Sequence, residues 1–166
     1  MRGRSKTITA ESDKTKPPLR YYLLIFACII GCIACGEPIN HDAALAGKRA
    51  VEFAKIAFVR QDAEKAYALL SSNTKRYVPF EKFKETLSRL HPSGHPSKVS
   101  AIEYEPMPGE KAIYIYITGE DTSGPFDYTL TMEGTASTDY RVSKFTRGVS
   151  YLPSTTEKKR FSQPIT

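Results

Sequence analysis

All three cysteines of this chain, Cys28, Cys32 and Cys35, lie in one apolar run near the N-terminus, residues 21–35. The sequence from residue 36 onward contains no cysteine. A domain in that stretch must therefore be held together by packing around one hydrophobic core, without disulfide bonds. The run itself is expected to determine where the chain is located.

The apolar run has the layout of a secretory signal. Six cationic and two acidic side chains precede it within the first twenty residues, and a basic segment before an apolar core is typical of export signals. As a helix, residues 21–35 would extend about 22 Å, which is short of the roughly 30 Å hydrocarbon core of a bilayer. The length favours a signal over a membrane-spanning helix.

Residues 29–32, Ile-Ile-Gly-Cys, resemble the lipobox of bacterial lipoproteins. The resemblance implies that the thiol of Cys32 carries a diacylglyceryl group and that the chain is cut just before it. Residues 1–31 would then be a signal peptide and residues 32–41 a lipidated tether. Cys35, which follows another small residue, is the alternative attachment site. The implied location is the bacterial cell membrane or outer membrane, with the domain facing the periplasm or the exterior.

The spacing of Cys32 and Cys35 also fits a redox pair or half of a metal site. Such sites need a folded, partly polar environment and often a second cysteine pair, which the sequence beyond the run does not supply. We therefore expect no metal and no cofactor. Most of the net charge of +6 comes from the basic flank, so the exported part is nearly neutral and nucleic-acid binding is not expected.

Helices are predicted in the first part of an α+β domain that covers residues 42–152. Asp42 is a candidate N-cap for a helix of about eighteen residues, whose alanines and phenylalanines recur mostly at three- and four-residue steps. A break precedes Asp62, which can cap a second helix that ends at residues 71–73. Pro79 suits the first turn of a third amphipathic helix.

Four strands are predicted after the loop at residues 91–96, where the hydrophobic period changes from about 3.6 to 2. The connections between these strands are short, which implies antiparallel pairing. Helices followed by an antiparallel meander predict the α+β class. The polar residues 153–166 are expected to form a disordered tail. The four strand segments are 99–104, 112–118, 126–133 and 140–145.

The segment 112–118 is apolar on both faces, with three isoleucines on one side and Tyr114 and Tyr116 on the other. A strand of this kind needs cover on both faces of the sheet. The helices can cover one face. A second subunit, a ligand or the curled edge of the sheet can cover the other, so a homodimer through the sheet is one candidate arrangement.

The stretch from residue 50 to residue 145 resembles the nuclear-transport-factor-two-like fold. The resemblance lies in Ala-Val-Glu-Phe-Ala-Lys-Ile-Ala at 50–57, in Ala-Tyr-Ala-Leu-Leu at 66–70 and in Phe-Glu-Lys-Phe at 80–83. It implies a curved sheet that wraps around helices to form a cystatin-like cone with an apolar pocket. Isomerases, dehydratases, binding modules and assembly subunits all use this cone, so the fold alone assigns no activity.

No residue is assigned a catalytic role. Asp127 and Glu133 share the polar face of their strand, and Asp62 suits a helix cap better than a general acid. His91 and His95 are four residues apart, but the prolines and glycine around them predict an exposed loop rather than a metal site. The candidates for lining a pocket or an interface are the strand tyrosines Tyr114, Tyr116, Tyr128 and Tyr140.

The expected function is that of a cell-envelope lipoprotein with a non-catalytic ligand-binding or assembly domain, whose ligand is left unassigned. One alternative is a small isomerase or dehydratase, which would require a buried acid or histidine beside a tyrosine in a cavity. The other is an uncleaved, single-span subunit of an envelope secretion complex, in which residues 1–20 would persist in the mature protein.

Overall fold

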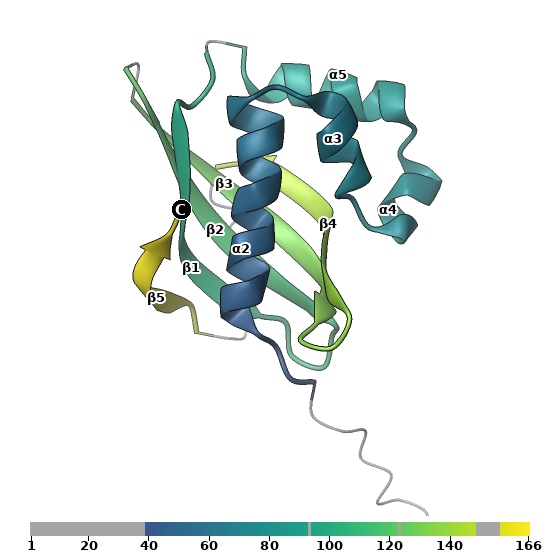
Figure 1. The fold of residues 1–166 in the computed structure, drawn as a ribbon, viewed down its shortest axis with the longest axis vertical. Helices are drawn as coiled ribbons and strands as arrows, with labels where there is room; N and C mark the ends of the chain where they lie inside the picture. The colour runs from purple at the N-terminus through teal and green to yellow at the C-terminus, as the bar shows by residue number, and fades with distance from the viewer. Residues whose placement is uncertain (1–38, 93, 123, 149–156) are drawn as a thin grey trace, which may run out of the picture. The chain divides into compact units, whose positions relative to one another are not determined.

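The computed structural model describes residues 39–92, 94–122, 124–148 and 157–166 (Figure 1). The apolar run and the cysteines Cys32 and Cys35 lie outside these residues, as does most of the expected tether. Within the described residues, no helix has the length and apolar character needed to span a membrane.

The α+β class and the antiparallel meander predicted from the sequence are confirmed. The sheet has five strands in the order β4-β3-β2-β1-β5, and every neighbouring pair is antiparallel. The helical elements are α2 (Ala43–Ala54), the π-helical segment η1 (Lys55–Val59), α3 (Ala63–Ala68), α4 (Ser72–Tyr77) and α5 (Phe80–Leu90). The strands are β1 (Lys98–Pro106), β2 (Ala112–Asp121), β3 (Gly124–Thr135), β4 (Asp139–Arg147) and β5 (Lys159–Ile165).

The core lies between α2 and one face of the sheet. Figure 1 shows α2 lying across this face, with α3, α4 and α5 grouped beside its C-terminal half. Period-2 alternation on β2 sends Ile113, Ile115 and Ile117 toward the helix, where each is almost fully buried. Phe53 on α2 and Leu130 on β3 complete the contact from either side. We refer to this helix-covered side as the inner face.

Both predicted aspartate caps are confirmed. The Oδ1 atom of Asp42 accepts a hydrogen bond from the backbone N–H of Leu45 at 2.9 Å, and Asp62 does the same for Lys65 at 3.0 Å. Each cap satisfies one of the N–H groups that the first helical turn leaves without a partner. The chain breaks between the two helices at Gln61, whose φ of 57° lies in the left-handed region.

The prediction that residues 71–73 end the second helix is wrong. α3 ends at Ala68, and Ser71 instead begins α4, because its Oγ accepts a hydrogen bond from Thr74 N at 3.2 Å. Serine is common both in loops and at N-caps, so composition could not separate these two roles.

The expected disordered tail is wrong for Lys159–Ile165, which form β5 and pair with β1; residues 153–156 lie outside the described residues. Phe161 packs on the ring of Tyr104 with 4.8 Å between centroids. Ile165 approaches α2 at Gly47, where an added Cβ would lie 2.6 Å from its Cδ1 atom. The side chains of Phe161 and Ile165 attach this otherwise polar segment to the sheet and to α2. The prediction failed because it relied on the overall polarity of the segment and not on these two apolar residues.

Candidate functional site

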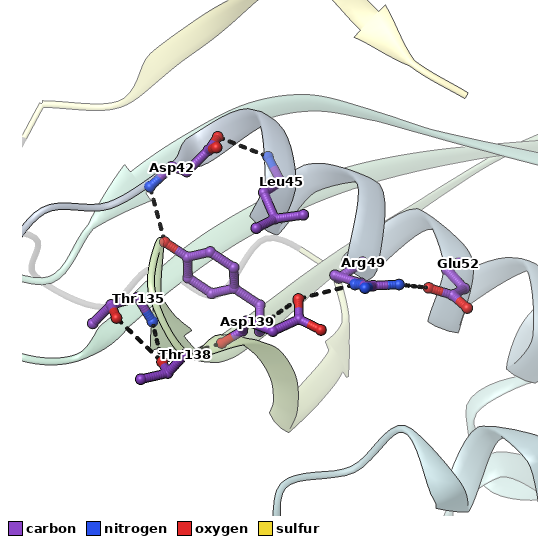
Figure 2. A network of polar contacts seen from close by, with 8 residues as sticks. Asp42, Leu45, Arg49, Glu52, Thr135, Thr138 and Asp139 are labelled. Atoms are coloured by element: carbon purple, nitrogen blue, oxygen red, sulfur yellow. Dashed lines mark hydrogen bonds and ion pairs between the residues drawn. The ribbon is translucent and has the colours of Figure 1, made fainter.

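Tyr140 fastens the start of α2 to β4. Its hydroxyl oxygen accepts a hydrogen bond from the backbone N–H of Asp42 at 3.0 Å (Figure 2). The Nδ1 atom of His41 lies 3.3 Å from the same oxygen, and His41 Nε2 lies 3.1 Å from the carbonyl oxygen of Glu110. A neutral imidazole that donates a hydrogen bond to that carbonyl through Nε2 can accept a hydrogen bond from the Tyr140 hydroxyl at Nδ1. Burial raises the pKa of Tyr140, so the hydroxyl stays protonated.

Arg49 links the middle of α2 to the hairpin between β3 and β4. Its Nε atom donates to Asp139 Oδ1 at 3.0 Å, and Nη1 donates to Glu52 Oε2 at 2.9 Å (Figure 2). The hydrogen bond from Arg49 lowers the pKa of Asp139, and the hydrogen bond to Asp139 raises the pKa of Arg49. Asp139 therefore remains ionised near neutral pH and is a weak proton acceptor.

The hairpin geometry that aims Asp139 depends on its own backbone and on Gly134. Asp139 has a φ of 61° and its Oδ1 also accepts the backbone N–H of Tyr140 at 2.8 Å. Gly134 has a φ of 140°, and a Cβ at this position would overlap the carbonyl of Asp139. Thr138 closes the turn, since its Oγ1 accepts from Thr135 N at 2.9 Å. The turn itself therefore orients the Asp139 carboxylate toward α2, independently of the hydrogen bond from Arg49.

These elements enclose a cavity of about 120 Å³ between α2 and β4, which we call the α2–β4 notch. Its apolar floor consists of Leu69, Met132 and Val142, and the last two are almost fully buried. Its rim consists of charged and polar residues of α2 and β4: Arg49, Glu52, Asp139, Tyr140 and Arg141. The notch thus combines an apolar base with charges of both signs.

The notch lies beside the outer edge of β4, at the point where the backbone groups of this edge strand stop pairing with the segment around Leu69 and Ser71. At Val142 the edge is covered, because Val142 N donates to the Leu69 carbonyl at 3.2 Å and Ser71 N donates to the Val142 carbonyl at 2.8 Å. Backbone groups two residues apart in a strand point to the same edge, so Tyr140 presents its N–H and C=O on that side. Asp139 satisfies the N–H, and the carbonyl is directed to the side of the notch.

A second polar site lies on the inner face, where His91 meets Tyr128. The two side chains are 6% and 1% exposed, and His91 Nε2 is 2.8 Å from the tyrosine hydroxyl. Desolvation and the nearby ring of His95 lower the pKa of His91 to about 4, and burial raises the pKa of Tyr128 to about 12. The prediction that His91 is exposed is wrong, because its loop folds back onto β3.

The π-helical segment η1 shapes this second site. It continues α2 with a wider turn, and it places Phe58 against Tyr128 with stacked rings 4.5 Å apart. The ring of His91 lies 5.2 Å from Phe58 and 4.6 Å from His95. The Nδ1 atom of His95 is buried and has no hydrogen-bond partner among the residues that the structure describes. Short π-helical segments are frequent at functional sites, so this cluster is the second candidate site.

Tyr116 lies on the opposite, outer face of the sheet. Its hydroxyl donates to Glu105 Oε2 at 2.9 Å, and the Nζ atom of Lys158 sits 4.0 Å from its ring centroid. Tyr116 is 7% exposed and Glu105 only 2%. Part of the second cover that strand 112–118 was expected to need is therefore supplied by the chain itself. Tyr114 lies on the same face and is half-buried.

The four candidate tyrosines do not converge on one site. Tyr140 lines the notch and Tyr128 belongs to the histidine cluster, whereas Tyr114 and Tyr116 occupy the outer face. The charged residues of the rim, Arg49 and Asp139 above all, were not identified from the sequence. Arg49 and Glu52 show the three-residue spacing of a helical ion pair, but no sequence signal links them to a turn ninety residues away.

Within the described residues, no group of three or more histidine, cysteine, aspartate or glutamate side chains is arranged to hold a metal ion. Comparison with family models, curated proteins and solved structures gave no match for this chain.

Proposed function

We propose that this chain is a bacterial cell-envelope lipoprotein whose domain binds a small ligand without transforming it, with the α2–β4 notch as the binding site. The observation that supports binding is the notch, a cavity of about 120 Å³ with an apolar floor and a charged rim. Small-ligand sites usually combine apolar walls with a few convergent polar groups. The lipid anchor rests on residues 29–32 and their flanks.

The chemistry of the rim favours binding over catalysis. A general base that works near neutral pH needs a pKa near that pH, whereas Arg49 lowers the pKa of Asp139. The raised pKa of Tyr140 keeps its hydroxyl protonated, and that hydroxyl already accepts from Asp42 N. These groups can recognise charge, but they are poorly suited to moving a proton.

The proposal includes the nuclear-transport-factor-two-like cone and a short connection to the membrane. Support for the cone comes from helices that precede an antiparallel sheet, with α2 packed on its inner face. Ten residue steps separate Cys32 from Asp42, which span at most about 35 Å when extended. A lipid on Cys32 would keep the notch close to the membrane surface, and two acyl chains would make that attachment durable.

The anchor is tested by the intact mass of the full chain extracted from the membranes of a lipoprotein-processing bacterium. We expect the loss of residues 1–31 together with a gain of acyl groups. Cys32→Ser should abolish both changes and Cys35→Ser should leave them intact; the reverse pattern assigns Cys35. A full-length, unmodified mass would reject the lipoprotein and favour the single-span secretion subunit, in which residues 1–20 persist.

Binding at the notch is tested by thermal shift with a library of small fragments. Hits should stabilise the wild-type protein and lose their effect in Leu69→Phe, which fills the floor of the notch. Hits that stabilise both proteins equally would place the binding site elsewhere. Sedimentation of both proteins also tests the homodimer through the sheet, because a monomer at high concentration excludes that arrangement.

A small isomerase or dehydratase is the second candidate function, and the buried His91–Tyr128 pair is the observation that favours it. A catalytic histidine must be reachable by its substrate. Reaction of the full chain with diethyl pyrocarbonate, located by peptide mass mapping, should therefore modify His91 at a rate close to that of the half-buried His41. Complete protection of His91 under native conditions would identify the pair as part of the core.

A further inference from the structure

The charges around the α2–β4 notch define the class of ligand that it can hold. Of the three floor residues, Met132 and Val142 are almost fully buried, so the half-buried Leu69 supplies the apolar surface that a ligand can reach. Its volume of about 120 Å³ is somewhat below that of the engineered cavity that takes benzene, so a ligand of about six non-hydrogen atoms fits. A short aliphatic group of such a ligand can pack against Leu69.

One side of the rim collects hydrogen-bond acceptors. Asp139 Oδ1 accepts hydrogen bonds from Arg49 Nε and from the backbone N–H of Tyr140. Glu52 Oε2 accepts a hydrogen bond from Arg49 Nη1. Among the contacts of the described residues, the second oxygen of each carboxylate, Asp139 Oδ2 and Glu52 Oε1, receives no hydrogen bond. The Tyr140 carbonyl is directed to the same side by the strand alternation. Three acceptors match the three N–H donors of a primary ammonium group.

The other side of the rim offers a cation. Arg141 is among the residues that line the notch, is exposed and forms no ion pair with any described residue. Strand alternation places its Cβ on the face opposite the inward Tyr140 and Val142, so its long side chain has to reach around the edge of β4 to bring the guanidinium group to the rim. Its register partner on β3 is Glu133, which also forms no ion pair within the described part of the chain. A guanidinium group binds a carboxylate through two parallel hydrogen bonds. Arg49 is less suited to binding the ligand's carboxylate, because its guanidinium group already forms ion pairs with Glu52 and Asp139.

We infer that the α2–β4 notch binds a small α-amino-acid zwitterion with a short aliphatic side chain. The ammonium group faces Asp139, Glu52 and the Tyr140 carbonyl, the carboxylate faces Arg141, and the side chain rests on the floor. Neither a simple cation nor a simple anion uses both halves of the rim, so the zwitterion is favoured over each. This inference rests on the proposed binding role of the notch and names its ligand class.

The test compares L-alanine with analogues that each lack one charge. Binding to the full chain in detergent is measured by calorimetry or ligand-observed NMR, with alaninamide as the analogue without a carboxylate and N-acetyl-L-alanine as the analogue without an ammonium group. Saturable binding of alanine is expected, and each analogue should bind at least about tenfold more weakly, because one charge-assisted hydrogen-bonding group is lost.

Two variants and a matched control locate the binding. Arg141→Gln should weaken alanine about tenfold without changing the weak binding of alaninamide, and Glu52→Gln should weaken alanine but not N-acetyl-alanine. Lys144→Gln removes an exposed cation from the same strand outside the notch, and it should change alanine affinity less than twofold. The melting temperature of each variant checks that the fold is kept.

Two results would overturn the inference: no binding of alanine to the wild-type protein, or alanine affinity that is unchanged in Arg141→Gln. If N-acetyl-alanine binds as tightly as alanine and needs Arg141, the ligand is an anion. The zwitterion class is then wrong while the notch remains a binding site, which separates this failure from failure of the proposed function. If the fragment hits stabilise the Leu69→Phe variant as much as the wild-type protein, both the zwitterion inference and the proposed binding role of the notch are wrong.

Discussion

The Nε2 atom of His91 lies 2.8 Å from the hydroxyl oxygen of Tyr128, in a part of the core where both side chains are almost fully buried. His91 also bonds the backbone of Leu87. A neutral imidazole can donate at one nitrogen and accept at the other, and burial favours this uncharged form of the ring over the cation. This pairing makes stability depend on pH.

Acidification should destabilise the domain through His91. The ring has a pKa of about 4 in the folded protein against 6.5 in an unfolded chain, so the unfolded state binds the proton first as the pH falls. The full stability is present above about pH 6.5 and is lost progressively toward pH 4, by roughly 3 kcal/mol. Electrostatic repulsion from His95 and Arg147 also lowers the pKa of His91 and so adds to this penalty.

The measurement is urea unfolding of the wild-type protein and of His91→Gln at several values between pH 4 and pH 7. Carboxylates titrate in both proteins, so the difference between their free energies of unfolding isolates the histidine. Parallel curves across this range would show that His91 does not titrate differently in the folded and unfolded states.

Tyr128→Phe should lower the free energy of unfolding by about 1 to 3 kcal/mol. The substitution keeps the ring that stacks on Phe58 but removes the hydroxyl, which leaves a buried acceptor on His91 without its partner. Tyr77→Phe is the matched control, because Tyr77 is 71% exposed. Equal effects of the two substitutions in denaturant unfolding would contradict a structural role for the His91 hydrogen bond.

Gly47→Val should release β5 from the sheet while the rest of the domain stays folded. A Cβ at Gly47 would lie 2.6 Å from Ile165 Cδ1 and 3.0 Å from Phe161 Cζ, so a branched side chain must displace the two apolar side chains through which β5 packs on α2. Amide hydrogen exchange should become faster in β5 and in the part of β1 that pairs with it. Gly47→Ala combined with Ile165→Ala is the compensated control, in which the strand should remain protected.

Asp62→Ala should destabilise the domain by about 1 kcal/mol, because it removes the acceptor for Lys65 N at the start of α3. Glu64→Ala, a change to an exposed carboxylate in the same helical turn, should have a smaller effect. Thermal unfolding of the two variants gives the comparison, and a loss no larger than that of Glu64→Ala would count against the cap.

Gly134→Ala should be severely destabilising. The backbone at Gly134 has a φ of 140°, which side-chain-bearing residues rarely adopt, and the new Cβ would overlap the Asp139 carbonyl. Gly109→Ala is the control, because Gly109 also has a positive φ but has nothing near its Cβ position. Expression and melting temperature should separate the two variants clearly.

The sequence predicted those parts of the fold that depend on local rules. Asp42 and Asp62 were identified as caps because a cap needs only a short side chain and the next three N–H groups. The alternation of Tyr128, Leu130 and Met132 predicted the buried side of β3 because strand periodicity does not depend on the rest of the molecule. Such features can be recognised within a few residues.

The candidate site depends on contacts between distant segments, which explains why most of it was missed. Arg49 meets Asp139 only because a hairpin with a left-handed residue turns that carboxylate toward α2. His91 was expected to be exposed because its neighbours are loop residues, yet the loop folds onto Tyr128. Only Tyr140 of the notch was identified beforehand, as one of four strand tyrosines.

The bond between Asp42 N and the hydroxyl of Tyr140 determines how a mechanical load would enter the domain. A pull on the residues before Asp42 would act on α2, on β4 through Tyr140 and on the Glu110 carbonyl through His41. The load would then spread over two hairpins of the sheet. The start of α2 is therefore tied to both hairpins, and one of these ties, through Tyr140, belongs to the rim of the notch.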